Sequence, residues 1–204
     1  MVMTKRSRRI PAASLFLIGL RAAVGPQTED EMSIAELIDD DGEREPLPIR
    51  VRLASLRDYE EMCALFDQLD ELHRQARPDM FQPFPPPART REQVAGWLAQ
   101  PDSTVLVAQS DEGVVGLAVL LTRAPSGFAG AVPRKVVEVD NLVVHADQRG
   151  RRIGRRLLAA AVEWSRQRRA THVEVAVHDF NRDARRFYES FGFAASVDRL
   201  ILAA

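Results

Sequence analysis

Residues 139–164 constrain the fold of this chain more than any other segment. A run rich in branched apolar residues leads into the turn Arg149-Gly150-Arg151-Arg152-Ile153-Gly154, and an amphipathic helical pattern begins directly after it. A strand, a short turn and a helix start in this order gather unpaired backbone N–H groups at the positive end of the helix dipole. The segment therefore predicts an anion-binding turn, and we expect the anion to be a phosphorylated ligand.

The glycines of this turn do not identify a ligand site by themselves, because ordinary loops also use glycine for positive φ angles. The spacing of Gly150 and Gly154 differs from the Gly-x-Gly-x-x-Gly of dinucleotide folds, and no Gly-Lys-Ser/Thr follows as it would in a P-loop. The strand before the turn and the helix after it favour phosphate binding. A purely structural turn is the alternative.

Composition narrows the class of protein. The chain has 204 residues, which suits one domain with a sizeable core. Its formal net charge of −1 argues against bulk attraction to nucleic acid or to a membrane surface. Cys63 is the only cysteine, so an internal disulfide and a cysteine-based metal site are excluded, and we expect a reducing cytoplasm.

Residues 1–48 differ from the rest of the chain. A basic head and the apolar residues 10–20 resemble the first two regions of a signal peptide, but Arg21 follows at once. The acidic part of the segment permits one short helix over residues 28–38, with little apolar surface to bury. We expect a disordered extension, and the alternatives are a true start at Met32 or export of the chain. The folded domain is expected at residues 49–204.

From residue 49 onward, hydrophobic periodicity predicts the order β-α-α-β-β-β-α-β-α-β, with one further strand at the end. Capping patterns at Ser55 and Thr90 mark two of the helix starts. A βαβ crossover beside hairpins implies an α/β fold with a mixed sheet covered by helices. Strands are expected near residues 49–53, 105–109, 114–121, 136–144, 172–177, 194 and 200–202.

A second motif occupies residues 181–193. Asn181 is placed to cap a helix, and Gly192 stands where a helix ends in a left-handed residue. Ala184 and Tyr188 lie four residues apart on one face of that helix, and the small side chain of Ala184 leaves room for a ligand to approach.

The turn and the second motif together resemble the GNAT superfamily of acyl-CoA N-acetyltransferases, over residues 49–204. The resemblance implies the GNAT-like fold and acetyl-CoA as co-substrate. In that family the turn holds the pyrophosphate, the preceding strand carries the pantetheine arm, and the residue at the position of Asn181 contacts the arm. The implied cofactor contacts are Leu142, Val143, Val144, Arg149, Gly150, Arg151, Arg152, Ile153, Gly154 and Asn181.

Arg152 departs from the family pattern, which has glycine at the middle position of the turn. If this position needs a positive φ, arginine there costs about 1 kcal/mol or more. A right-handed backbone would remove that cost, and in either case the added cation would help to hold phosphate. We expect cofactor binding to survive the substitution.

Amine attack on a thioester needs a donor for the developing oxyanion, an acid for the departing thiolate and a base for the amine proton. The resemblance implies the backbone N–H of Val144 as the oxyanion donor and Tyr188 as the acid. The alternative for Tyr188 is an ordinary tyrosine that covers the core.

Glu138 and Asp140 are the candidates for the base. Strand alternation places both on one side, in line with Leu142 and Val144. The alternatives are a pair of solvated carboxylates, or a carboxylate paired with a nearby arginine. His178, at the end of the next strand, is a weaker candidate for the same role.

The first helix and the loop after it are where the resemblance implies the acceptor wall. His73 is a candidate acceptor contact, although a helix-surface histidine is more often structural. Cys63 follows Met62 at core spacing, so an inert, buried thiol is expected rather than a nucleophile.

The resemblance implies an N-acetyltransferase that moves acetyl from acetyl-CoA to a primary amine by direct transfer, without a metal, and we expect it in the cytoplasm. The acceptor stays open among amino acids, polyamines, antibiotics and peptide N-termini, and a longer acyl donor and a homodimer stay open too. A non-catalytic acyl-CoA sensor is the alternative. An RNA-associated protein is a third, weaker one, because the arginine-rich helix lacks interleaved aromatic residues, so neither nucleic acid nor membrane is expected as a partner.

Overall fold

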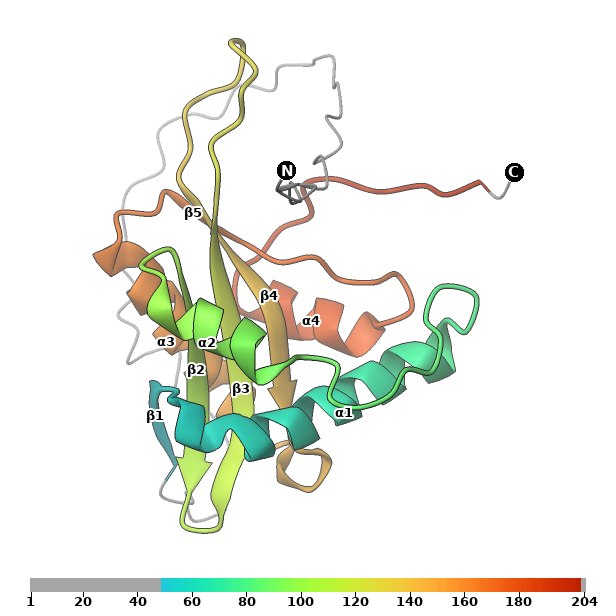
Figure 1. Ribbon diagram of the computed structural model, residues 1–204. Helices are drawn as coiled ribbons and strands as arrows, with labels where there is room; N and C mark the ends of the chain where they lie inside the picture. The colour runs from blue at the N-terminus through green and yellow to red at the C-terminus, as the bar shows by residue number, and fades with distance from the viewer. Residues whose placement is uncertain (1–48, 203–204) are drawn as a thin grey trace, which may run out of the picture. The chain divides into compact units, whose positions relative to one another are not determined.

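The computed structural model of this protein describes residues 49–202, which all belong to one compact unit (Figure 1). The predictions made for residues 1–48, namely the disordered extension, the short helix, the start at Met32 and export, lie outside the described residues. Within the described part, no helix is both long enough and apolar enough to cross a membrane.

A five-stranded sheet forms the centre of the fold, in the order β1-β2-β3-β4-β5. Each neighbouring pair among the first four strands is antiparallel, whereas β5 runs parallel to β4. The predicted mixed sheet is therefore confirmed. The strands are β1 (Arg50–Leu53), β2 (Ser103–Ser110), β3 (Gly113–Arg123), β4 (Val136–Val144) and β5 (His172–Glu174).

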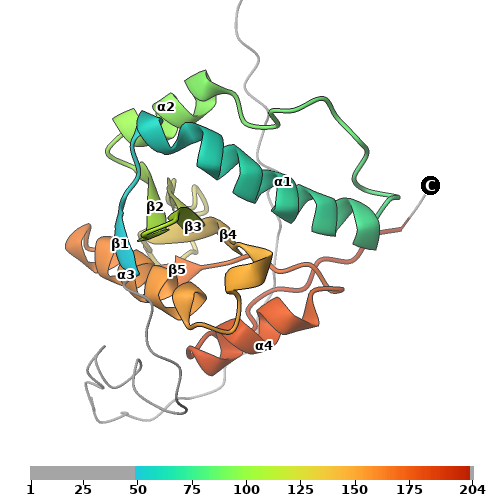
Figure 2. The same cartoon turned by 90° about the horizontal axis from the view of Figure 1, so that it is seen from below.

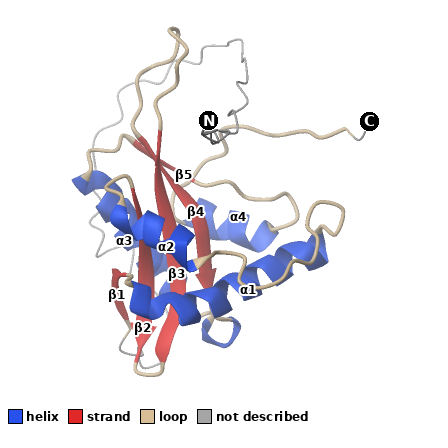
Figure 3. Ribbon diagram, in the orientation of Figure 1, coloured by secondary structure: helices blue, strands red, loops and turns tan. Residues whose placement is uncertain are grey.

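Helices cover both faces of the sheet (Figures 2 and 3). On one face, α1 (Tyr59–Ala76) and α2 (Arg91–Ala99) pack on a core that includes Phe66 and Val94. On the other face, α3 (Ile153–Gln167) and α4 (Arg182–Ser190) pack on a second core that includes Leu157 and Tyr188. Two short 3₁₀ helices, η1 (Leu56–Asp58) and η2 (Ala146–Gln148), precede α1 and follow β4. The sheet therefore separates an α1/α2 face from an α3/α4 face.

Local capping explains where several helices begin. The capping box predicted at Ser55 is present, because the Ser55 side chain accepts from the Arg57 N–H and the Asp58 carboxylate accepts from the Ser55 N–H. The Thr90 side chain accepts from the Gln93 N–H at 3.2 Å and begins α2. Both caps were readable from the sequence, since each needs only residues a few positions apart.

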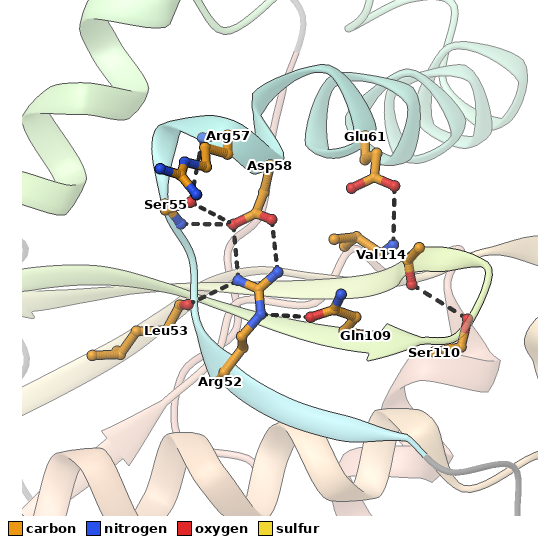
Figure 4. Close-up of polar contacts among 10 residues, drawn as sticks. Arg52, Leu53, Ser55, Arg57, Asp58, Glu61, Gln109, Ser110 and Val114 are labelled. Atoms are coloured by element: carbon orange, nitrogen blue, oxygen red, sulfur yellow. Dashed lines mark hydrogen bonds and ion pairs between the residues drawn. The ribbon is translucent and has the colours of Figure 1, made fainter.

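A buried ion pair ties the start of α1 to the edge of the sheet (Figure 4). Arg52 of β1 donates to both carboxylate oxygens of Asp58, at 2.9 and 2.7 Å, and to Gln109 of β2 at 2.7 Å. The Asp58 side chain is only 8% exposed. The bond from Arg52 holds the pKa of Asp58 down at about 2. This pair fixes β1, β2 and η1 against one another.

Three of the predicted strands differ from the structure. Strand pairing after α3 covers only His172–Glu174, so the prediction of a strand over residues 172–177 is confirmed for its first half alone. Residues 193–202 contain no strand, and the predicted pair near 194 and 200–202 is wrong. Leu200 and Leu202 are 93% and 92% exposed, so no neighbouring strand covers the apolar side chains on which that prediction rested.

Candidate active site

The sheet opens between β4 and β5. Their pairing ends at Glu138 opposite Glu174, whereas β4 continues to Val144. The N–H of His145 donates to Val115 of β3 at 2.9 Å. Because successive N–H groups of a strand point to opposite edges, those of Leu142 and Val144 point away from β3, toward the side that β5 has left. This edge can accept an extended ligand as if it were an added strand.

The turn after β4 adopts the backbone of an anion site. Gly150 has φ of 77°, and Arg152 has φ of 57° and ψ of 10°, which is the left-handed region. The helical hydrogen bonds of α3 begin with Arg156 N–H to the Arg152 carbonyl at 3.1 Å, so the N–H groups of Ile153 and Gly154 precede the first of them. The conditional cost foreseen for Arg152 therefore applies, because its backbone is left-handed.

Arg149 links this turn to the strand before it. Its Nε donates to the carbonyl of Val144 at 3.2 Å, and Gly154 lies beside Phe187 of α4. The predicted pantetheine edge and the predicted pyrophosphate turn are thus continuous in space, and both border α4.

Tyr188 lies in the core of the α3/α4 face. The α4 helix begins as predicted, with the Asn181 side chain accepting from the Ala184 N–H at 3.0 Å, and it ends before Gly192, which has φ of 101°. Tyr188 is only 7% exposed, and burial raises its pKa to about 12. The phenol therefore stays protonated at neutral pH and can donate a proton or a hydrogen bond.

A β-bulge at Asp140 changes the faces of β4. Asn141 pairs with Val119 and Val139 pairs with Leu120, so Asp140 is the extra residue between them. Val139 joins the α3/α4 core, whereas Val143, an even number of positions later, joins the α1/α2 core. The bulge has reversed the alternation.

The predicted alignment of the two carboxylates is therefore wrong in part. Leu142 and Val144 pack on the α3/α4 core, whereas Glu138 alternates with the buried Val137 and Val139 and faces α1/α2. Strand alternation predicted that all four side chains lie on one side of β4. The prediction missed the bulge because a bulge depends on the pairing with β3 and cannot be read from the residues of β4 alone. The base candidates and Tyr188 accordingly lie on opposite faces of the sheet.

The two base candidates differ in their partners. Glu138 makes a close ion pair with Arg123 of β3. Asp140 lies 3.7 Å from Arg123 and accepts a hydrogen bond from the Asn141 side chain at 2.6 Å. Burial and the neighbouring Glu138 raise the pKa of Asp140. Asp140 is thus the carboxylate of the two that is less tightly paired with Arg123.

Arg89, in the connection between α1 and α2, completes this polar cluster, and no sequence pattern marked it. Its guanidinium makes a close ion pair with Asp70 of α1, donates to the Asn141 Oδ1 at 3.3 Å and lies over the Phe66 ring at 4.6 Å. Neighbouring residues in sequence carry no signal for this contact, because Arg89 and Asn141 lie far apart in the chain.

Four rings from separate segments meet at the end of α1. His73 contacts His178 with ring centroids 5.2 Å apart, and Phe81 and Phe180 pack against both imidazoles. Burial and the nearby His73 lower the pKa of His178. The candidate acceptor contact and the weaker base candidate therefore belong to one cluster on the α1/α2 face.

In the part of the chain that the structure describes, the lone cysteine lies outside these clusters of functional candidates, and the metal-ligating side chains form no metal site of their own. Cys63 of α1 packs against the α1/α2 core but is only half-buried, so the predicted full burial is not reached, and its inertness stays a prediction. Among residues 49–202, no three His, Cys, Asp or Glu side chains are grouped so that they could hold a metal ion.

Solved structures of other proteins are similar to this fold. The BH1408 protein from Bacillus halodurans, solved as a tetramutant, is 27% identical with a TM-score of 0.71, and the match covers 76% of this chain and 99% of that one. A transcriptional regulator from Bacillus halodurans C-125 (23% identity, TM-score 0.63) matches over 76% and 99% of the two chains. The aminoglycoside N-acetyltransferase AAC(6')-Iy in complex with CoA (17% identity, TM-score 0.56) matches over 76% and 98%.

No curated protein matches the sequence significantly. The profile of the acetyltransferase (GNAT) family, by contrast, matches residues 66–193, which include the opened edge of β4, the turn and Tyr188. With the mixed sheet and the structural neighbours, this match assigns the chain: it belongs to the GNAT acetyltransferase family.

Proposed function

We propose that this protein transfers an acetyl group from acetyl-CoA to a primary amine by direct attack of the amine on the thioester. One observation carries the proposal: Tyr188, a buried proton donor, lies on one face of the sheet that opens between β4 and β5, and Asp140, a carboxylate of raised pKa, lies on the other face. A thioester that threads the gap would meet both groups.

The donor half of the proposal uses the α3/α4 face. The N–H group of Val144, the one nearer to the turn, would bond the pantetheine arm along the free edge of β4. The turn at residues 149–154 would hold the pyrophosphate with backbone N–H groups and arginine cations. The amide Nδ2 of Asn181 keeps its hydrogens for the cofactor arm, because only its Oδ1 caps α4.

The acceptor half uses the α1/α2 face. Asp140 would take the proton of the amine, directly or through a water molecule, as the nitrogen bonds to the thioester carbon. The Leu142 N–H, rather than the Val144 N–H expected from the sequence, would stabilise the oxyanion, because Leu142 lies nearer to Asp140 and farther from the turn along β4. As the carbon–sulfur bond breaks, Tyr188 would give its proton to the departing thiolate, and exchange with solvent restores both side chains.

An acyl-CoA sensor is the second candidate. A structural neighbour named as a transcriptional regulator, with a TM-score of 0.63, supports this alternative. The sensor would use the same β4 edge and turn but would need neither Asp140 nor Tyr188 to move protons.

Thiol release from acetyl-CoA in the presence of an amine panel separates the two. For the enzyme, we expect release that depends on one class of amine, and Asp140→Asn should lower kcat by about 100-fold or more, as expected for loss of a general base. Asp111→Asn, in the exposed β2–β3 turn, is the matched control and should leave kcat unchanged. Saturable acetyl-CoA binding with no release for any amine would favour the sensor.

A further inference from the structure

One arginine links the helices of the α1/α2 face to the carboxylate at the bulge of β4. We infer that Arg89 is a positioning residue, which acts through Asn141 to orient the Asp140 carboxylate for proton transfer. This inference rests on the proposed acetyl transfer, and it adds a residue outside both sequence motifs to the site.

The link is a continuous chain of polar contacts. Arg89 donates to the Asn141 Oδ1 at 3.3 Å, and the Asn141 Nδ2 donates to the Asp140 Oδ2 at 2.6 Å. The bulge makes this chain geometrically available, because it turns Asp140 and Asn141 toward the same face of the sheet.

The donor and acceptor roles in these hydrogen bonds follow from the chemistry of the three side chains. A guanidinium has only donors, so the end of the Asn141 amide that meets Arg89 must be its oxygen. The nitrogen end is then directed at Asp140, and it occupies Oδ2. The other oxygen, Oδ1, lies 3.7 Å from Arg123, beyond hydrogen-bond distance, and keeps its lone pairs for an incoming proton.

Arg89 is itself held on three sides. Its ion pair with Asp70 is largely buried, with side-chain exposures of 18% and 14%, and its guanidinium lies 4.6 Å from the centre of the Phe66 ring. The orientation of Asp140 is therefore set by α1, which forms the wall on the α1/α2 face. An acceptor that displaces α1 would disturb the base as well.

A second arginine, the first residue of α2, supplies the control. Arg91 also stacks on an α1 ring, 4.4 Å from the centre of Tyr59, and also pairs with an α1 carboxylate, Glu60 at 3.1 Å. Arg91 donates to Leu56 of η1 and Glu60 of α1, whereas Arg89 reaches Asn141 of β4. Substitution of each arginine thus compares two residues that both stack on and pair with α1, of which only Arg89 is largely buried and linked to Asp140.

The test uses Arg89→Gln combined with Asp70→Asn, so that no buried charge is left unpaired, and Arg91→Gln as the control. Loss of the Arg89 cation and of its bond to Asn141 should lower kcat about tenfold, as misplacement of a catalytic group does. It should also move the acidic limb of the pH profile of kcat/KM upward by about half a pH unit, since a neighbouring cation favours the carboxylate. The affinity for acetyl-CoA, measured by calorimetry, should not change.

Carboxyl-carbon NMR of Asp140 provides a readout that needs no turnover, and the Asp140 titration should move upward in the double variant but not in Arg91→Gln. If the double variant keeps the wild-type pH profile and Asp140 titration, Arg89 has no positioning role. If no amine supports turnover but the Asp140 titration moves as expected, the link to Asp140 stands and the proposed acetyl transfer fails. Asn141→Ala removes the hydrogen-bond link between Arg89 and Asp140 and leaves the Arg89–Asp70 ion pair intact, so it should lower kcat similarly. A wild-type kcat in this variant would overturn the inference.

Discussion

Two arginines with left-handed backbones flank α3, and they allow the role of the anion turn to be separated from its strain. Arg152, before the helix, and Arg169, after it, both have φ of 57°. Arg169 stands where helices commonly end in glycine, and its N–H bonds the Arg166 carbonyl at 2.8 Å. Only Arg152 belongs to the proposed pyrophosphate site.

Replacement of each arginine with glycine should stabilise the fold. A left-handed conformation costs an L-residue about 1–2 kcal/mol, and glycine costs about 0.5–1 kcal/mol of extra chain entropy on folding. The net gain is then about 0.5–1 kcal/mol for each substitution, which corresponds to a Tm increase of about 2 °C in a domain of this size.

The two variants should differ in cofactor affinity. Arg152→Gly removes a cation next to the proposed pyrophosphate, and we expect acetyl-CoA to bind about tenfold more weakly, because a charge-assisted hydrogen bond contributes about 1.5 kcal/mol. Arg169→Gly should bind acetyl-CoA as the wild type does. Urea unfolding and isothermal calorimetry measure the two quantities. If Arg152→Gly neither stabilises the fold nor weakens binding while Arg169→Gly gains stability, the reasoning about this turn is refuted.

Three further perturbations follow from buried groups. Tyr188→Phe should lower kcat by about 100-fold and leave the acetyl-CoA Kd near the wild-type value, since a general acid acts in the transition state; unchanged turnover in a thiol-release assay would remove it from the mechanism. The pKa of Asp58, about 2 against the usual 3.8, is lowered in the folded state, so its stabilisation is present above pH 3.8 and lost as pH falls toward 2. Asp58→Asn should remove about 2 kcal/mol at neutral pH and flatten that acid-side dependence in urea unfolding, and a parallel pH curve would contradict this. The pKa of His178 is lowered in the folded state, so as pH drops below about 6.5 the imidazole is protonated in the unfolded chain before it is protonated in the folded one, and the stability of the fold decreases. His178→Phe should reduce that decrease in urea unfolding, and a pH dependence identical to that of the wild type would exclude His178 as its source.

Features that depend on neighbouring residues in sequence were predictable. The caps at Ser55, Thr90 and Asn181 and the left-handed Gly192 each need only a few consecutive residues, and all four are present. The mixed sheet followed from a crossover next to hairpins, which leaves few topologies.

Features that depend on distant partners were not predictable. The bulge at Asp140 exists only in the register of β4 against β3, so strand alternation alone wrongly put Leu142 on the same face as Glu138. Arg89 lies beside a helix cap in sequence and acts on β4 only because α1 holds it there. Branched residues near position 200 predicted a strand, but the described residues provide no partner strand for them, and they form none.

The central claim is that acetyl-CoA lies along the free edge of β4 and ends at the first turn of α3. Amide hydrogen exchange with and without saturating acetyl-CoA tests it residue by residue. We expect slower exchange at the N–H groups of Leu142, Val144, Ile153 and Gly154, and unchanged exchange in α2 on the other side of the sheet. Saturating binding that leaves these four amides unprotected, or that protects α2 instead, would contradict the account.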